Sequence, residues 1–368
     1  MPTPPRRSRS RLGAAAVAVL LVAGCGGGEE AAPSSAAPPS TTRLPTTSAP
    51  PTTAAPAISV PFPEGTVPAP LTGLPIDPAR AGNRAVIIKV DNHRDARPQT
   101  GLDRADIVFD YRAEGVTRFA AVFQSELADP VGPVRSSRTG DFDILSGFDH
   151  PVYGSSGGND GVIHGLRRLP IFAMTNWDRE EYYRDPARRS PHDLMVDTTV
   201  LYAAAERRWG SELSDLPGPT PWFSYALPGE PGSVGRPVDG PVTVDFRGSP
   251  VVTWEWDPAR VGWARGQDGH PHLTSDGVQI APANVVIMVT SYGTSSADVT
   301  SPEVRSLGGG DLFVLTGGQV IEGTWTREAA TEPPTLVDTG GAPLVLTAGR
   351  TWVLYPEKGQ VRVPTAVP

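Results

Sequence analysis

A long stretch near the N-terminus has a composition that cannot form a folded core, and it limits where this chain can fold. Residues 26–70 read GGGEEAAPSSAAPPSTTRLPTTSAPPTTAAPAISVPFPEGTVPAP, rich in Pro, Thr, Ser and Ala and poor in large apolar side chains. Such a segment buries too little apolar surface to offset the entropy lost on ordering, and its prolines favour an extended spacer. We predict a disordered tether over residues 25–70 and folded structure from about residue 71 onward.

The residues before this tether have the pattern of an export signal. The basic MPTPPRRSRSRLG precedes AAAVAVLLVAGC, whose apolar run of about a dozen residues is too short to span a bilayer as a helix. The run ends in Val22-Ala23-Gly24-Cys25, which resembles a bacterial lipobox. Cys25 is the only cysteine, so no disulfide can form within the chain. We predict a lipoprotein signal peptide over residues 1–24 and an extracytoplasmic protein anchored to the cell membrane through lipidated Cys25.

The remaining part of the chain is long enough for two domains. Residues 71–210 alternate strand-like runs (RAVIIKVDN, ADIVFDY, TRFAAVFQS) with helix-like ones such as DTTVLYAAAERRWG. Residues 211–240 are rich in Pro and Gly and are predicted to be a linker. Residues 241–368 hold short β-branched and aromatic runs without a long helical pattern. We predict an α+β fold, with an N-terminal mixed α/β sheet domain at 71–210 followed by a mostly-β C-terminal domain at 241–368.

The net charge of −8 is unevenly spread along the chain. Residues 71–210 contain 18 Lys and Arg against 20 Asp and Glu, whereas residues 211–368 contain 9 against 17. A protein that binds nucleic acid needs a net basic face, so this distribution argues against nucleic acid as a partner.

Seven stretches spread over the folded chain match a known family. In the first segment they are PLTGLP, RPQTGLDRADIVFDYRAEGVTRFAAVFQS, GPVRSSR and SPHDLMVDT, and in the second they are NVVIMV, GGQVIEGTW and GRTWVLYP. With these residues the chain resembles the YerB-type lipoproteins, a bacterial family built from domains of unknown function. The resemblance implies the architecture and an extracytoplasmic location, and it carries no activity.

A second resemblance, at the level of pattern only, is to the LytR-CpsA-Psr phosphotransferases. Those enzymes attach cell-wall polymers carried on a polyprenyl pyrophosphate, which arginines grip. The match is the strand ADIVF followed by a strand and an arginine-bearing loop. The Arg-Asp pair expected after the second strand is not clearly present, because Arg138 is followed by Thr139-Gly140-Asp141. As an alternative function, this resemblance implies phosphotransfer, with Asp141 or Glu114 placing Mg²⁺ or acting as a base.

The arginines of the family-like stretches are the main candidates for ligand binding. A guanidinium group stays charged and makes bidentate contacts with phosphate or carboxylate. If their segment begins a helix, Arg135 and Arg138 share a face. We predict that an arginine-rich loop region binds either an anionic cell-wall ligand, such as wall polymer, or an envelope partner, such as a wall-synthesis protein. The residues expected to do so are Arg97, Arg118, Arg135, Arg138, Glu114, Thr117, Asp141 and His192.

The competing interpretation is that these arginines hold the fold together rather than a ligand. Acidic residues are close in the sequence, and the near-neutral charge of residues 71–210 favours internal pairing. The expected partners in that case are Glu114, Asp110, Asp141 and Asp143. His192 follows a proline in SPHDL, and it could serve as an acid, a base or a ligand donor, or cap the helix that starts near Asp197.

A glycine-rich stretch, YGSSGGNDGVIHG, offers a third function. It leads from a strand into a helix, a geometry that can cradle phosphate on backbone amides. It also contains Gly-x-Ser-x-Gly, the nucleophile-elbow pattern, with Ser156 as the nucleophile and Asp185 and His192 following in α/β-hydrolase order. The spacing is cramped for that fold, so a serine hydrolase using Ser156 remains an alternative and an ordinary loop is favoured.

The sequence contains no strong metal-binding pattern. H-E-x-x-H is absent, and the pair His270-x-His272 lies in a predicted hairpin tip. We predict no metal and no cofactor, with Mg²⁺ expected only under the phosphotransferase alternative. Trp254 and Trp256 share one face of a predicted strand, where packing in a sheet core is the commoner role than stacking on sugars.

Overall fold

The structure is a computed structural model that describes residues 62–175, 180–227, 230–247 and 250–365. The predicted signal peptide, the lipidation site Cys25 and the tether up to residue 61 lie outside the described residues. Within the described part of the chain, no helix combines the length and the apolar character needed to cross a membrane.

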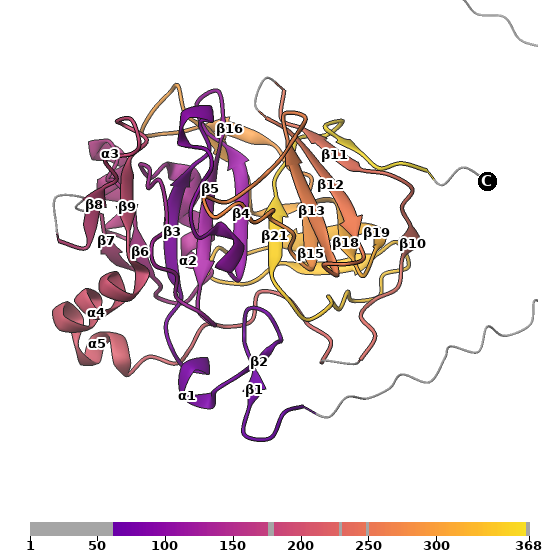
Figure 1. The fold of residues 1–368 in the computed structure, drawn as a ribbon, viewed down its shortest axis with the longest axis horizontal. Coiled ribbons are helices and arrows are strands. Elements are labelled where there is room, and N and C mark those ends of the chain that lie inside the picture. The colour runs from indigo at the N-terminus through magenta and orange to yellow at the C-terminus, as the bar shows by residue number, and fades with distance from the viewer. Residues whose placement is uncertain (1–61, 176–179, 228–229, 248–249, 366–368) are drawn as a thin grey trace, which may run out of the picture. The chain divides into compact units, whose positions relative to one another are not determined.

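The first predicted segment supplies half of a central sheet and the helices that cover it (Figure 1). The three expected strands are present, and a turn with Gly115 at φ +66° joins β4 to β5, a conformation that favours glycine. The strands are β3 (Val86–Asp91), β4 (Ile107–Arg112), β5 (Thr117–Phe123), β6 (Val152–Gly154) and β7 (Phe172–Met174). The helices are α2 (Phe142–Ser146), α3 (Asp160–Leu166) and α4 (Thr198–Trp209), and α5 (Ser211–Ser214) follows directly in the predicted linker.

The second predicted segment is built almost entirely of strands. Six of them join the central sheet: β10 (Arg236–Pro237), β15 (Asn284–Met288), β18 (Gly308–Thr316), β19 (Gln319–Arg327), β20 (Thr335–Asp338) and β21 (Thr351–Leu354). A separate five-stranded antiparallel sheet contains, in spatial order, β14 (His270–Pro271), β13 (Gly262–Gln267), β12 (Val251–Asp257), β11 (Val242–Asp245) and β22 (Val361–Arg362).

Short elements complete the fold. Three two-stranded sheets pair β1 (Val67–Pro68) with β2 (Pro75–Ile76), β8 (Tyr182–Arg184) with β9 (Leu194–Val196), and β16 (Tyr292–Thr294) with β17 (Pro302–Val304). The single-turn helices are α1 (Pro78–Ala81), η1 (Arg94–Ala96), η2 (Leu102–Arg104) and η3 (Thr139–Asp141).

One continuous sheet of 11 strands unites the two segments. Its order is β10-β19-β18-β15-β21-β4-β5-β3-β6-β7, with β20 paired to β19. The junction is β21, which runs parallel to both β15 and β4 and sets Thr351 opposite Ile107 and Leu354 opposite Asp110. The α+β class expected from the sequence is confirmed, and the sheet passes from one segment into the other without a break.

Both faces of the central sheet are buried, which explains the nearly continuous apolar runs of its strands. Val86, Ile88 and Val90 of β3 belong to a core that also contains residues of α4, α5 and the five-stranded sheet. Ile87, on the opposite face, packs in a core with residues of α2 and α3. Successive strand residues point to opposite faces, so alternate side chains of β3 pack into two different cores.

Residues 211–240, the predicted linker, contribute to the second of these cores. They contain α5 and the side chain of Trp222, which is buried. The Trp222 indole donates to the Gly147 carbonyl at 3.0 Å and stacks on Phe148 with ring centroids 4.9 Å apart. Aromatic anchors therefore fasten this Pro- and Gly-rich segment beside α2.

Candidate functional site

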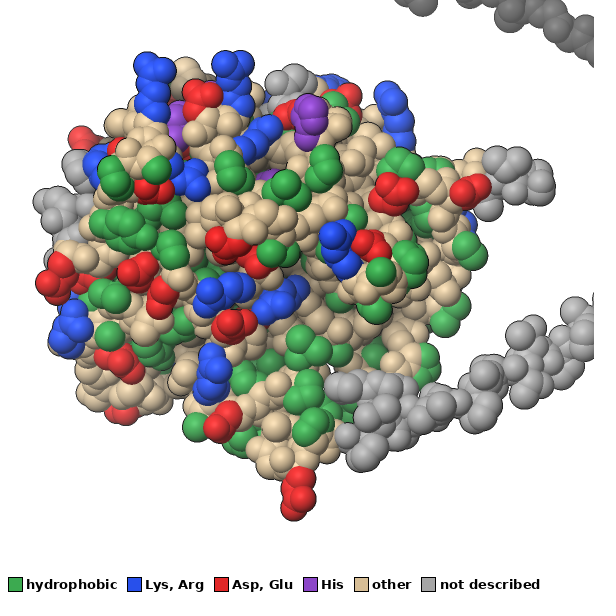
Figure 2. Space-filling model, viewed as in Figure 1, with side chains coloured by type: hydrophobic (Ala, Val, Ile, Leu, Met, Phe, Trp, Pro, Cys, Tyr) green, Lys and Arg blue, Asp and Glu red, His purple; other side chains and the backbone are tan. Residues whose placement is uncertain are grey.

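Every one of the four candidate arginines has a carboxylate partner. Their segments are extended or single-turn, so Arg135 and Arg138 do not share a helix face, and the expectation based on a helix is wrong. On the face drawn in Figure 2, basic and acidic side chains are interspersed. The pairs are Arg97 with Asp268 at 2.8 Å, Arg118 with Glu114 at 3.0 Å, Arg135 with Asp91 at 3.1 Å, and Arg138 with Glu114.

Of the acidic residues expected from the sequence to pair with these arginines, Glu114 does so with two of them. It accepts from Arg118 and Arg138 and also from the Ser301 hydroxyl at 2.6 Å. Burial by itself would raise the pKa of Glu114, but the hydrogen bonds from Arg138 and Ser301 and the charge of Arg118 together lower it to about 2. The Glu114 carboxylate is therefore ionised at neutral pH and stabilises the fold through its pairs with Arg118 and Arg138.

We expect Glu114→Gln to lower the free energy of unfolding by about 2 kcal/mol at neutral pH. A pKa moved from 4.5 to about 2 corresponds to roughly 3 kcal/mol before partial exposure weakens it. Because the folded-state pKa is depressed, this stability is present above pH 4.5 and is lost as the pH falls toward 2. Urea unfolding across this pH range measures it.

The matched control for this prediction is Glu357→Gln. Glu357 pairs with one arginine, Arg112, at 2.7 Å, and its side chain has the same 29% exposure as that of Glu114. Its loss of stability should be smaller than that of Glu114→Gln. Equal losses for the two variants at every pH would contradict the special role assigned to Glu114.

Asp141 and Thr117 lie in the interior, where they bond to other buried groups. Asp141 sits 2.6 Å from the Lys89 ammonium, and it also accepts from the hydroxyls of Tyr111 and Tyr153. The Thr117 hydroxyl accepts from Asn92 Nδ2 at 2.8 Å. These positions suit structural roles, and Asp141 is not available to place a metal or act as a base in phosphotransfer. Of the expected arginine partners, Asp110 pairs with Arg265 and Asp143 bonds to Ser306. Asp141 accepts from the backbone N–H of Arg138 at 2.7 Å, and its ion pair is with Lys89.

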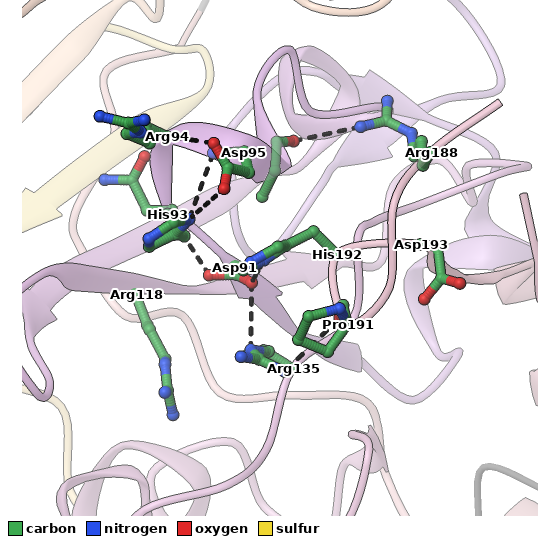
Figure 3. Close-up of polar contacts among 12 residues, drawn as sticks. Asp91, His93, Arg94, Asp95, Arg118, Arg135, Arg188, Pro191, His192 and Asp193 are labelled. Atoms are coloured by element: carbon green, nitrogen blue, oxygen red, sulfur yellow. Dashed lines mark hydrogen bonds and ion pairs between the residues drawn. The ribbon is translucent and has the colours of Figure 1, made fainter.

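A cluster around Asp91 forms at the end of β3 and includes two histidines (Figure 3). The Asp91 carboxylate is buried and lies 2.7 Å from His192 Nδ1 and 3.1 Å from Arg135 Nε. Its second oxygen accepts from the His93 backbone N–H at 2.9 Å. The rings of His93 and His192 stack with centroids 4.5 Å apart and an angle of 7° between their planes. Sequence reasoning included Arg135 and His192 but missed Asp91 and His93.

The topology explains why these residues meet. β3 and β6 are parallel neighbours, so the loops after their carboxyl ends lie at the same edge of the sheet. The GPVRSSR segment runs between those loops: the Arg135 amide donates to the Lys89 carbonyl at 2.8 Å, and the Ser156 amide donates to the Arg135 carbonyl at 3.1 Å. Arg188 donates to the carbonyls of Ala96 and Pro98, which holds the loop of His192 against that of His93.

Beside this cluster lies a cavity of about 200 Å³. The Ser136 and Ser156 hydroxyls are 3.2 Å apart there, and Arg135 Nη2 has no hydrogen-bond partner among the described residues. The cavity is lined by Val134, Arg135, Ser136, Ser156, Arg184, Pro191 and Leu194. It therefore presents guanidinium and hydroxyl donors together.

The triad proposed for a serine hydrolase is not assembled. Ser156 shares a hydrogen bond with Ser136, and His192 pairs with Asp91 rather than with Asp185, whose carboxylate bonds to Arg188 Nε at 3.2 Å. The chain order matched the hydrolase pattern, but the sheet brings a different carboxylate to the histidine.

The second histidine pair is also separated by the fold. His272 is buried, with Nε2 2.8 Å from Gln99 Oε1, whereas His270 is exposed. Burial, followed by the charges of Arg265 and Arg97, holds the pKa of His272 well below its usual value. Trp254 is buried against Trp352, in agreement with the predicted core role.

Comparisons with known proteins agree with the family features of the sequence. The N-terminal domain model of "Protein of unknown function (DUF3048)" matches residues 71–212, and its C-terminal domain model matches residues 242–353. The chain is 29% identical over 306 residues to "Putative lipoprotein YerB" of Bacillus subtilis (strain 168), covering 80% of this chain and 88% of the relative.

A solved structure gives the same result at the level of the fold. The crystal structure of YerB from Bacillus subtilis superposes with a TM-score of 0.71 at 26% identity, covering 81% of this chain and all of that one. The resemblance to YerB-type proteins is thereby confirmed. Both domain models match in order along the folded part, so the chain belongs to the DUF3048 family, and YerB is a relative of this chain.

Proposed function

We propose that this protein is a lipid-anchored component of the cell envelope that binds an anionic group of the cell wall in the cavity beside Arg135. The name of the YerB relative and the lipobox-like residues ending at Cys25 support the anchor. The observation that carries the binding role is the meeting of Arg135, Ser136 and Ser156 in one cavity of about 200 Å³. We name this the Arg135 cavity.

The charges around the Arg135 cavity favour an anion. The guanidinium groups of Arg118, Arg135 and Arg138 share two carboxylates, those of Asp91 and Glu114. The pKa of Arg118 is lowered by burial first and then by the charge of Arg138, with a further contribution from Arg135. Bound phosphate or carboxylate would relieve this repulsion.

The Arg135 side chain is also well placed for recognition. Asp91 holds Nε, which orients the guanidinium plane before any ligand arrives and leaves Nη2 for a second contact. Preorganisation of this kind reduces the entropy lost on binding. The ligand class is a phosphate or carboxylate carried by wall polymer or by a muropeptide, and the Ser136 and Ser156 hydroxyls provide further donors.

Binding by the full-length protein in detergent tests this proposal. We expect purified wall polymer, undecaprenyl pyrophosphate or a short muropeptide to bind, and Arg135→Gln to weaken binding at least about tenfold, since a hydrogen bond to a charged group contributes roughly 1.5–3 kcal/mol. Isothermal titration calorimetry measures the affinity.

The control for this experiment is Arg236→Gln. Arg236 also pairs with a carboxylate, Glu322 at 3.0 Å, but it lies outside the Arg135 cavity. Its affinity should equal that of the unmodified protein. No binding of any of the three probes, or equal binding by the Arg135 and Arg236 variants, would overturn the proposal.

A further inference from the structure

We propose that His93, Asp95 and His192 form a binding site for a divalent transition metal ion of the zinc class. Each residue offers one ligand atom, and these three atoms lie within 4.8 Å of one another. His93 and Asp95 belong to the loop after β3, and His192 precedes β9 (Figure 3). The site is distinct from the Arg135 cavity, whose lining includes none of the three.

The chemistry of these donors selects the class of ion. Two imidazoles and a carboxylate are a ligand set of catalytic zinc sites, in which a water molecule occupies a fourth position. Imidazole nitrogen suits zinc, copper, iron and nickel, whereas Mg²⁺ and Ca²⁺ prefer sites made of oxygen alone. We therefore expect the site to bind Zn²⁺ and Co²⁺ and to discriminate against Mg²⁺.

A second observation, independent of the clustering, concerns the orientation of His192. Its Nδ1 lies 2.7 Å from the buried carboxylate of Asp91, which Arg135 and the His93 amide hold in place. Metal-bound histidines characteristically donate one ring N–H to a carboxylate, which fixes the tautomer and presents the other nitrogen to the ion. Asp91 thus prepares His192 Nε2 as a ligand.

The other two ligands can adjust without disturbing the core. The His93 side chain is 40% exposed and Asp95 is 51% exposed. Asp95 is 3.4 Å from Arg94, whose side chain is 85% exposed, so an ion would displace only a weak surface pair. His93 Nδ1 accepts from the Asp95 amide at 3.2 Å, and its ring lies nearly parallel to that of His192. Because the lone pair of an imidazole nitrogen lies in the ring plane, the exposed His93 ring turns out of this stack when it binds the ion.

The experiment is a metal titration of the full-length protein in detergent after treatment with a chelator. We expect one Zn²⁺ to bind per chain, and Co²⁺ to give the visible absorption of a four-coordinate site. His93→Asn and Asp95→Asn should each weaken binding at least about tenfold. In His93→Asn the amide oxygen can still accept from the Asp95 N–H and cap η1, so this variant tests the ligand rather than the fold.

The matched control is His150→Asn. The His150 side chain is also 40% exposed and lies beside a carboxylate, Asp149, but it is outside the proposed site. Its Zn²⁺ affinity should equal that of the unmodified protein. Failure to bind Zn²⁺ or Co²⁺, Mg²⁺ binding as tight as that of Zn²⁺, or equal effects of the His93 and His150 substitutions would each overturn the site. None of these outcomes bears on wall-ligand binding, which is measured with metal absent.

Discussion

Asp110→Asn is expected to lower the free energy of unfolding by about 3–5 kcal/mol, the usual cost of leaving one member of a buried ion pair without its partner. Asp110 Oδ2 lies 2.8 Å from Arg265 Nη2, and both side chains are completely buried. Asparagine keeps the shape of the side chain, so the loss reports the charge. Denaturant unfolding of the purified protein measures it.

The cost is large because Arg265 cannot turn toward water. Its guanidinium lies 4.8 Å from the Trp352 ring centroid, and Nη1 bonds to both Gln267 and His272. Burial lowers the pKa of Arg265 to about 10 even with Asp110 opposite, and the charge and hydrogen bond of Asp110 keep it from falling further. Asp110→Asn therefore leaves the buried guanidinium without its counter-charge. The pair links β4 to the five-stranded sheet, so its loss should weaken the contact between the two segments.

The control for Asp110 is Glu322→Gln, which breaks the exposed pair between Glu322 and Arg236. Exposed pairs contribute about 1 kcal/mol or less. If the two variants lost equal stability, the buried pair would not have the role assigned to it here.

Asp141→Asn is expected to cost a similar amount, about 3–5 kcal/mol, because it leaves the Lys89 ammonium buried without a counter-charge. Burial lowers the pKa of Lys89 to about 8, and Asp141 is the group that keeps it from falling further. Loss of Asp141 therefore moves the folded-state pKa of Lys89 below 8, farther from its unfolded value of about 10.5.

The pH dependence of this variant has a definite sign. Where Lys89 is neutral in the folded variant but still charged in the unfolded chain, the unfolded chain binds more protons and stability rises with pH. The deficit relative to the unmodified protein should narrow as the pH rises toward 8 and then level off, because above that pH Lys89 is neutral in both folded proteins. Urea unfolding on either side of pH 8 measures the change.

Asp143→Asn provides the comparison for Asp141. Asp143 is two residues away and partly exposed, and its carboxylate accepts from the neutral hydroxyl of Ser306 at 3.3 Å. Its backbone carbonyl accepts from Arg327 Nη2 at 2.8 Å, a contact that the substitution keeps. The loss of stability in this variant should be about 1 kcal/mol or less. A deficit for Asp141→Asn that stayed constant between pH 6 and 9 would show that Lys89 is not the group responsible.

Much of the fold could be predicted because it depends on local patterns. The apolar runs of β3, β4 and β5 were predicted from neighbouring residues, and the structure has these strands. The helix-like run DTTVLYAAAERRWG forms α4, which ends at Trp209 with Gly210 at its C-cap. The periodicity of a strand or helix is set within a few residues, so the sequence alone contains it.

The candidate site could be predicted only in part, and Arg135 illustrates why. Its family-like stretch and its charge identified it as a site residue, but its partner was sought among acids nearby in the sequence. Asp91 is that partner, and it also binds His192, which is 101 residues away along the chain. The residues next to Asp91 in the sequence do not indicate that the side chains of Arg135 and His192 bind it.

The sequence by itself determined the family and the α+β class, and it named the four candidate arginines without their positions in the fold. Only the tertiary structure decided the partner of each charge, the continuous sheet through β21, and the meeting of His93, Asp95 and His192. The physical reason is one of range. Strand formation follows from neighbouring residues, whereas an ion pair such as Asp110 with Arg265, 155 residues apart, exists only after strand order and register bring the two atoms within a few ångströms.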